Sequence, residues 1–303
     1  MSVIAMTGGT GFVGGASIDA ALASGHQVRA LTRRPQAERE GVTWVPGALD
    51  DPQSLSELCI GADCVLHIAG VVNAPDRAGF IAGNITGTEN MLAAAKAAGV
   101  ARFIHVSSLA AREPGLSNYC CSKAEAEARV IASGLGWQMV RPPAVYGPGD
   151  TEMLDLFRMA ARGVVMLPPG GRMSVVHVAD LAALLVRLAG GAGDTGAIYE
   201  VDDGAPRGWS HKDFADALGD AVGRKVRAFS TPKLALHLAA QGDRLLRGKA
   251  AKLTPDRARY IAHSDWTAHP DRKPPSQLWS AEIPTRQGLA DTARWYRAKG
   301  WLK

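Results

Sequence analysis

Short apolar runs alternate with amphipathic stretches through the first half of the chain. The apolar run at residues 3–6 ends in glycines, which predicts a buried strand, and residues 12–24 have helical spacing and stop at Gly25. The same two patterns recur as far as residue 145. They predict further strands at 28–31, 43–45, 64–68, 103–106 and 138–140, and helices at 54–59, 84–98 and 118–133.

Strands that alternate with helices indicate βαβ units and therefore a parallel sheet. Residues 1–145 are thus expected to form an α/β domain with helices on both faces of the sheet. Farther on the alternation weakens, although strands at 175–178 and 199–201 are expected to return to the sheet, within about 172–202. The rest of residues 146–303 is predicted to form a smaller, mostly helical lobe that binds the substrate.

Three glycines, at positions 8, 11 and 14, follow the first predicted strand and open the first predicted helix. Glycine lets the backbone approach a pyrophosphate closely, and the helix N-terminus offers free N–H groups and a favourable dipole. An ordinary tight turn is the alternative, and three glycines with this spacing and these flanks argue against it. We therefore predict a doubly wound Rossmann sheet that holds a dinucleotide on the loop residues Thr7, Gly8, Thr10, Gly11, Phe12, Val13 and Gly14.

The end of the second strand indicates which dinucleotide is bound. NAD enzymes carry Asp or Glu there for the ribose 2′-hydroxyl, but this chain has no acidic residue between Asp19 and Glu38. The strand ends in Thr32, Arg33 and Arg34 instead, and guanidinium groups suit a 2′-phosphate. Two solvated surface arginines are the alternative. We predict NADP(H), with NAD as the second choice of cofactor.

Tyr119 and Lys123 are one helical turn apart and so share a helix face. A phenol titrates near pH 10, and a neighbouring cation lowers its pKa, which makes the tyrosine a usable acid or base at neutral pH. This spacing alone is common on exposed helices. Here, however, the helix follows the predicted strand that ends in Val106, Ser107 and Ser108, so the pair is a candidate catalytic site.

Taken together, these motifs resemble the extended short-chain dehydrogenase/reductases, an epimerase/dehydratase-like family, and most closely its dihydroflavonol reductase and 3β-hydroxysteroid dehydrogenase branch. The resemblance covers nearly the whole chain. Besides the glycine loop, the serine pair and the Tyr–Lys pair, it rests on His67-Ile68-Ala69-Gly70, Asn84 with Gly87-Thr88-Glu89-Asn90, Arg141-Pro142-Pro143, Tyr146-Gly147-Pro148-Gly149, Val176-His177-Val178-Ala179-Asp180, Gly288-Leu289 and Trp295-Tyr296.

The resemblance implies that Tyr119 exchanges the proton, that Lys123 lowers its pKa and holds the nicotinamide ribose, and that Ser108 binds the reacting oxygen. Asn84 is either a fourth catalytic residue or a simple helix N-cap. Ala48 replaces the aspartate that contacts adenine in the family, which leaves the role of Asp50 open. The further cofactor contacts that the resemblance implies are Leu49, Asp50, Ile68, Ala69, Gly70, Val106, Arg141, Pro142 and Val145.

Two departures from the sequences of related dehydratases and sugar epimerases indicate the reaction class. Leu109 follows Ser108 where related dehydratases carry an Asp-Glu pair, and Arg33 replaces the acidic residue of NAD-dependent sugar epimerases. We therefore expect hydride transfer between NADP(H) and a carbonyl or secondary alcohol of a small organic substrate. A nucleotide-sugar epimerase with retained NAD and a non-catalytic NAD(P)H-binding sensor or assembly protein stay open as alternatives. The intact Ser108, Tyr119 and Lys123 set argues against the last of these.

The formal charge of +5 could attract nucleic acid or anionic lipid, but no five or six Lys and Arg residues stand together. No apolar run is long enough to span a membrane, and the N-terminus lacks the basic start of a signal peptide. The spacing of the four cysteines does not resemble a metal site. We expect a cytoplasmic protein without a nucleic-acid partner, a metal or a membrane span.

Residues 233–247 form an amphipathic stretch with basic edges, which could contact a membrane or admit an apolar substrate. More often such a stripe packs on the protein's own core, and that is the expectation here. The family resemblance also implies a homodimer through the helices predicted at 84–98 and 118–133.

Overall fold

Seven parallel strands form the central sheet, in the order β11-β6-β5-β4-β1-β2-β3. The computed structural model describes residues 1–168, 170–248, 251 and 253–303. The order reverses at β1, which lies between β2 and β4, so the predicted doubly wound Rossmann sheet is confirmed. The strands are β1 (Val3–Thr7), β2 (Gln27–Thr32), β3 (Val42–Pro46), β4 (Cys64–His67), β5 (Arg102–Val106), β6 (Gly136–Arg141) and β11 (Ile198–Glu200).

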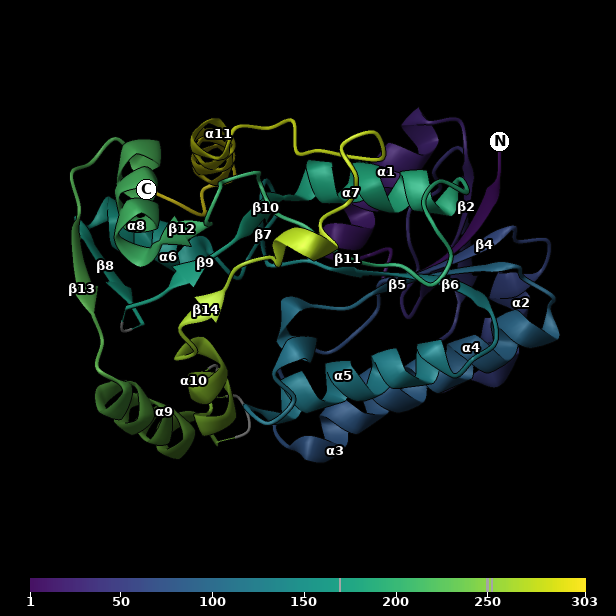
Figure 1. Cartoon of the computed structure of the whole chain (residues 1–303), viewed down its shortest axis with the longest axis horizontal. Coiled ribbons are helices and arrows are strands. Elements are labelled where there is room, and N and C mark those ends of the chain that lie inside the picture. Colours follow the sequence, from purple (N-terminus) through teal and green to yellow (C-terminus); the bar gives the residue numbers. More distant parts are fainter. Residues whose placement is uncertain (169, 249–250, 252) are drawn as a thin grey trace.

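Helices cover both faces of this sheet (Figure 1). Strand side chains alternate between the two layers, since Ile4 and Met6 belong to one buried cluster and Ala5 to another. Burial on both faces explains the continuous apolar runs in the sequence. On one face lie α1 (Phe12–Ala23) and α7 (Val178–Ala189), and on the other lie α2 (Pro52–Cys59), α4 (Gly87–Ala97) and α5 (Asn118–Ile131).

Three short helical segments lie next to these elements. They are α3 (Arg77–Phe80), the π-helical η1 (Ile81–Thr86), which runs directly into α4, and the 3-10 helix η2 (Leu109–Arg112). The helix predicted at 84–98 therefore begins as a π-helix. In the part of the chain that the structure describes, no helix is both long and apolar enough to cross a membrane.

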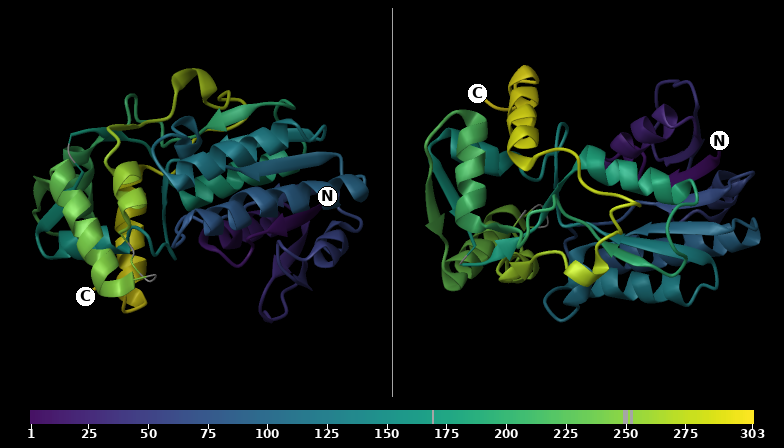
Figure 2. Two further views of the ribbon diagram at one scale, coloured as in Figure 1. Left: turned by 90° about the horizontal axis from the view of Figure 1, so that it is seen from below. Right: turned by 45° about the horizontal axis from the view of Figure 1, so that its top comes forward.

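A second lobe lies beside the sheet and fills the left half of Figure 1. It has a core of its own, in which the rings of Phe157 and Tyr296 pack edge to face with centroids 5.1 Å apart. Figure 2 shows α8 and α11 side by side at this end of the molecule. The helices of the lobe are α6 (Leu154–Ala161), α8 (His211–Val222), α9 (Lys233–Arg247), α10 (Pro255–Ile261) and α11 (Thr285–Ala298), whereas the 3-10 helix η4 (Pro270–Arg272) contacts β11 of the main sheet.

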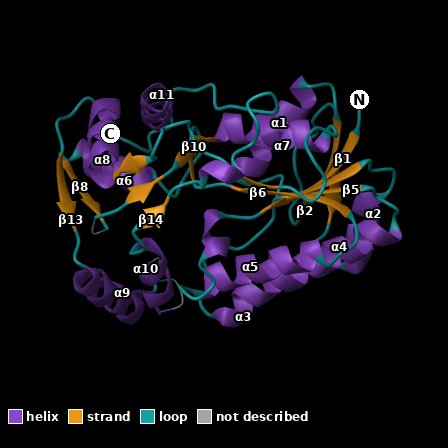
Figure 3. Cartoon of the chain, in the orientation of Figure 1, coloured by secondary structure: helices purple, strands orange, loops and turns teal. Residues whose placement is uncertain are grey.

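Short strands link the lobe to the sheet (Figure 3). Of the two strands expected to return to the main sheet, only β11 does so, by pairing with β6. The other, β10 (Val175–His177), pairs with β7 (Ala144–Tyr146) outside it, so that part of the prediction is wrong. The remaining strands are β8 (Val164–Leu167), β13 (Arg227–Ser230), β9 (Arg172–Met173), β12 (Trp209–Ser210) and β14 (Asp265–Trp266).

Candidate active site

The glycine loop joins β1 to α1 so tightly that side chains would not fit. Gly8 has a left-handed φ of 76°, and a Cβ there would lie 2.8 Å from the Ala69 nitrogen. A Cβ on Gly14 would lie 2.0 Å from the Gly8 carbonyl oxygen. Thr10 and Gly11 are exposed, and none of the described side chains caps the N-terminus of α1. The N–H groups of that helix end are therefore available to phosphate oxygens.

Thr7 and His67 tie β1 to β4 beside this loop. The Thr7 hydroxyl forms a 2.8 Å hydrogen bond with His67 Nδ1 and accepts one from the Ala69 N–H at 3.2 Å. His67 Nε2 lies 3.0 Å from the Thr88 hydroxyl. Burial, and to a lesser extent Lys123, lowers the pKa of His67 to about 3, so the ring is neutral. Thr7 therefore uses its side chain to position the loop, and His67 is a structural residue whose role the sequence did not indicate.

The hydroxyls of Ser108 and Tyr119 meet beyond the carboxyl end of β5. The side chain of Ser108 interacts with the phenol of Tyr119, at the start of α5, and lowers its pKa. Its oxygen also accepts a 3.2 Å hydrogen bond from the Ala110 N–H and so caps η2. The Ser107 hydroxyl is buried and makes no hydrogen bond to the described residues. Ser108 is thus the member of the serine pair that lies against the tyrosine.

The phenol of Tyr119 stays protonated at neutral pH. Burial raises the pKa of Tyr119 above its ordinary value, and the interaction with Ser108 opposes this rise. Lys123 is not among the groups that shift it, so the lowering expected from Lys123 is not observed. A protonated phenol is the form that can donate a proton to a carbonyl oxygen.

Lys123 reaches back from α5 to the end of β5. Its ammonium group donates a 2.9 Å hydrogen bond to the Val106 carbonyl oxygen. Burial lowers the pKa of Lys123 to about 8, and the Glu127 carboxylate opposes the change. A Cβ on Gly70 would lie 3.9 Å from Lys123 Nζ and 3.1 Å from Asn84 Oδ1. The structure therefore brings Gly70, Asn84 and Lys123 together at one place.

Asn84 lies inside η1 and not at the start of a helix, so the N-cap alternative is wrong. Its amide nitrogen donates to the Val71 carbonyl at 2.9 Å and to the Ser122 hydroxyl at 2.8 Å, and its oxygen accepts from the Val71 N–H at 2.6 Å. Ser122 in turn donates to the Tyr119 carbonyl at 2.8 Å. Asn84 therefore fixes the backbone that carries Tyr119, in a π-helical segment of the kind often found at functional sites.

Two rings from distant parts of the chain flank Tyr119. The ring centroid of Phe80 lies 6.2 Å away, and that of Tyr260 lies 5.6 Å away in an edge-to-face arrangement. Tyr260 belongs to α10, which is held in place because the Asn118 N–H donates a 2.8 Å hydrogen bond to the Asp256 carboxylate. Sequence reasoning missed both rings, because neither lies in a recognisable motif.

The residues expected at the adenosine end of the cofactor follow β2 and β3. Thr32 donates a 2.6 Å hydrogen bond to the Arg34 carbonyl and so shapes the turn after β2. Arg33 and Arg34 are exposed, and their guanidinium groups form no ion pair within the described residues. Leu49 is half-buried and Asp50 is exposed. Both arginine side chains are therefore accessible to an anionic group.

Comparison with known proteins agrees with this arrangement. A family model described as NAD(P)H-binding matches residues 8–189. The chain is 38% identical to the ceramide reductase of Caulobacter vibrioides (strain NA1000 / CB15N), over 99% of this chain and 96% of that protein. The chain belongs to the extended short-chain dehydrogenase/reductases. It is accordingly an NAD(P)-dependent oxidoreductase.

Two further similarities extend the family assignment. The 2-alkyl-3-oxoalkanoate reductase of Stenotrophomonas maltophilia (strain K279a) is 31% identical over 88% of this chain and 90% of that protein. The UDP-glucose 4-epimerase of Thermus thermophilus, solved in complex with NAD, superimposes with a TM-score of 0.70 and 22% identity, covering 98% of this chain and 99% of that one. At that identity, the second similarity supports the fold alone.

In this short-chain dehydrogenase/reductase the glycine loop fits a dinucleotide. A Cβ at Gly8 or Gly14 would collide with the backbone of Ala69 or Gly8, so the glycines let α1 begin close to the end of β1, with its uncapped N-terminus available to a pyrophosphate. The remaining predicted contacts share the same edge of the sheet, since the carboxyl ends of parallel strands lie together. They follow or end β1, β4, β5 and β6: Phe12, Val13, Ile68, Ala69, Val106, Pro142 and Val145.

The side chain of Arg141 is engaged in a different part of this short-chain dehydrogenase/reductase. Its guanidinium group binds the Glu127 carboxylate at 2.6 Å and the Glu200 carboxylate at 3.1 Å. Arg112 binds Glu200 as well, at 3.1 Å. This largely buried network joins α5, β6, β11 and η2. Removing one member would leave a buried charge without its partner, which is strongly destabilising.

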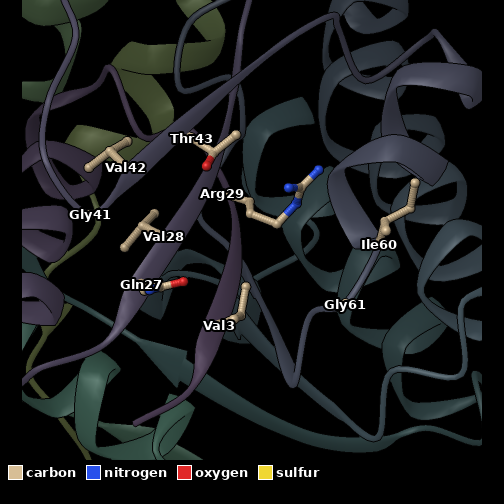
Figure 4. A pocket seen from close by; sticks show the side chains of 9 residues that line it. All are labelled: Val3, Gln27, Val28, Arg29, Gly41, Val42, Thr43, Ile60 and Gly61. Carbon is tan, nitrogen blue, oxygen red and sulfur yellow. The ribbon is translucent and has the colours of Figure 1, made fainter.

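Figure 4 shows a cavity of about 390 Å³ whose lining does not include Ser108, Tyr119 or Lys123. It sits at the amino ends of β1, β2 and β3, whereas the glycine loop follows the carboxyl end of β1. None of the predicted site residues lines it. The candidate active site therefore rests on the convergence of Ser108, Tyr119, Lys123 and Asn84 and not on this cavity. The cavity is lined by Val3, Gln27, Val28, Arg29, Gly41, Val42, Thr43, Ile60 and Gly61.

Proposed function

We propose that this chain is an NADPH-dependent reductase of a carbonyl group in an apolar, long-chain substrate. The observation that carries the proposal is the protonated Tyr119 phenol, which interacts with Ser108 and is flanked by the rings of Phe80 and Tyr260. A proton donor with aromatic walls suits a carbonyl oxygen on an apolar molecule.

The proposed mechanism assigns each polar group one task. The nicotinamide, when bound, supplies the hydride that reaches the carbonyl carbon. Ser108 orients the carbonyl oxygen, and Tyr119 donates its proton to that oxygen as the negative charge develops there. The Lys123 ammonium, buried beside Gly70, would bind the nicotinamide ribose. Asn84 acts through the backbone of Tyr119 and is a positioning residue.

Two features support NADPH over NADH. Arg33 and Arg34 are exposed at the end of β2, and residues 20–37 contain no acidic side chain that would repel a 2′-phosphate. A pair of guanidinium groups recognises phosphate through charge-assisted hydrogen bonds.

The apolar substrate class is supported by the relatives and by the site. Ceramide and a 2-alkyl-3-oxoalkanoate, for which two relatives are named, both carry alkyl chains. Beyond Tyr260 the ring of Trp266 extends the aromatic wall, with ring centroids 4.9 Å apart. A nucleotide sugar would place hydroxyl groups against these rings, which would leave those groups without hydrogen-bond partners.

The reductase proposal predicts consumption of NADPH with a 2-alkyl-3-oxoalkanoate and no conversion of UDP-glucose. Absorbance of the reduced nicotinamide would follow the first reaction, and native mass spectrometry would show whether the purified protein retains a cofactor. Retained NAD together with epimerisation of UDP-glucose would establish the epimerase alternative. Tight NADPH binding without turnover of either substrate would favour a non-catalytic sensor.

A double Arg33→Ala, Arg34→Ala variant tests the cofactor preference. We expect its dissociation constant for NADPH to rise by about 10- to 100-fold, because two charge-assisted hydrogen bonds to the phosphate are lost. NADH binding should change little, and fluorescence titration measures both. Arg39→Ala is a matched control, since Arg39 is an exposed arginine already paired with Asp19 at 2.6 Å. Equal weakening of NADH and NADPH would show that the arginines do not read the 2′-phosphate.

A further inference from the structure

Helix α9 presents leucine side chains to solvent. Leu234, Leu238, Leu245 and Leu246 are 71%, 58%, 87% and 87% exposed, whereas Ala240 on the opposite side is fully buried. The spacing of the first three places them on one helix face. The expectation that this stripe packs on the chain's own core is therefore wrong. In Figure 1, α9 lies at the lower left edge of the molecule, beside α10.

A second apolar strip lies on β8 and β13. Met166 and Phe229 face each other across the two strands and are 53% and 52% exposed. Val165 and Leu167 are buried, so the alternating residue Met166 points away from the core of the lobe. Arg227 shares the face of Phe229, two positions along β13. β13 leads directly into α9 (Figure 1), so the strip and the exposed leucines follow one another along one edge.

The sequence segment that contains β13 and α9 is rich in positive charge. Residues 224–252 contain eight of the 34 Lys and Arg residues and one of the 29 Asp and Glu residues, which leaves 26 and 28 in the rest of the chain. The net positive charge of the protein therefore comes from this segment. Arg224, Lys225 and Arg227 are all exposed just ahead of α9, and the last two form no ion pair within the described residues.

We propose that these elements form a docking surface for an anionic lipid bilayer. The surface consists of Leu234, Leu238, Leu245 and Leu246 of α9 with Val164, Met166 and Phe229 of the two strands. Exposed apolar side chains with adjacent cations suit the boundary between acyl chains and anionic headgroups. A second copy of the chain is a poorer occupant, because a twofold interface would bring the two positive segments together.

The position of α10 connects this surface to the active site. α10 packs beside α9 and carries Tyr260 to the ring of Tyr119. A long-chain substrate dissolves in the bilayer. In a protein docked through α9, only α10 would separate the membrane-bound helix from the proton donor Tyr119. This last step rests on the proposed function, whereas docking itself does not.

Co-sedimentation of the full chain with lipid vesicles tests the proposal. We expect binding to vesicles of phosphatidylcholine mixed with phosphatidylglycerol, weaker binding to phosphatidylcholine alone, and release as salt is raised. A double Leu245→Asp, Leu246→Asp variant should bind more than about tenfold more weakly, because both side chains would enter the bilayer. Ile60→Asp is the matched control. Ile60 is also an exposed apolar residue, at 64%, but it lies at the C-terminal end of α2 and not on the proposed surface.

Each outcome bears on the surface itself. Unchanged binding by the double variant, or no binding by the unaltered chain, would overturn the proposal. A dimer that the double variant dissociates, without any vesicle binding, would assign the surface to a second copy instead. Vesicle binding is measured without turnover, so its failure is distinguishable from failure of the proposed reductase activity. Circular dichroism and NADPH binding of the double variant confirm that it remains folded.

Discussion

Tyr119→Phe is expected to lower kcat for carbonyl reduction by about 10²- to 10⁴-fold, the usual contribution of a positioned general acid. The ring of the new phenylalanine would keep its contacts with Phe80 and Tyr260, so the fold should be unaffected. Only the hydroxyl that interacts with Ser108 is lost. Steady-state kinetics with NADPH and the best carbonyl substrate measure the effect, and NADPH titration should show an unchanged dissociation constant.

Tyr260→Phe is the matched control for that experiment. It makes the same change in the neighbouring tyrosine, whose contribution to the site is its ring. Its kcat should stay within a few-fold of the unaltered enzyme. Comparable losses in the two variants, or full activity in Tyr119→Phe, would remove Tyr119 from its role as proton donor.

Gly14→Ala is expected to abolish tight dinucleotide binding and to destabilise the fold by about 3 kcal/mol, the upper range for overpacking a core. The added Cβ would lie 2.0 Å from the Gly8 carbonyl oxygen and 2.8 Å from the Gly9 Cα. Both atoms belong to the backbone, so α1 must move away from the glycine loop. The N–H groups at the start of α1 then leave the phosphate position. Thermal unfolding and NADPH titration measure the two effects.

Gly15→Ala provides an unusually close control for this variant. Gly15 is the next residue of the same helix, and a Cβ there would meet nothing within 4 Å. Alanine is favoured over glycine inside a helix, so this change should stabilise the protein by about 0.5–1 kcal/mol. Cofactor binding should remain. If both alanine variants behaved alike, the close approach of α1 to the loop would not explain the glycine.

Sequence patterns predicted the main sheet well, because strands buried on both faces are continuous apolar runs. β1 to β6 all lie where such runs occur. The short strands of the lobe, such as β9 and β12, escaped prediction because two residues cannot show a period. β10 was assigned to the wrong sheet for a related reason: an apolar run shows that a strand is buried but does not identify its partner.

In the candidate site, too, the residues in local motifs could be predicted from the sequence and the long-range contacts could not. Gly8, Gly14, Ser108, Tyr119 and Lys123 follow local motifs, and the structure places them at one edge of the sheet. Tyr260 and the exposure of the α9 leucines depend on contacts between segments far apart in the chain. The amphipathic helix predicted at residues 233–247 is confirmed as α9, but the hydrophobic period that predicts a helix cannot show whether anything covers its apolar face.

The arrangement of β11 also sets an order for folding during synthesis. β6 stays an open edge, and Arg141 and Arg112 lack the Glu200 carboxylate, until the ribosome has released the chain beyond residue 200. An unpaired strand edge is a site for aggregation. The nascent protein is therefore most in need of chaperone protection while the segment between β6 and β11, which begins the second lobe, is being made.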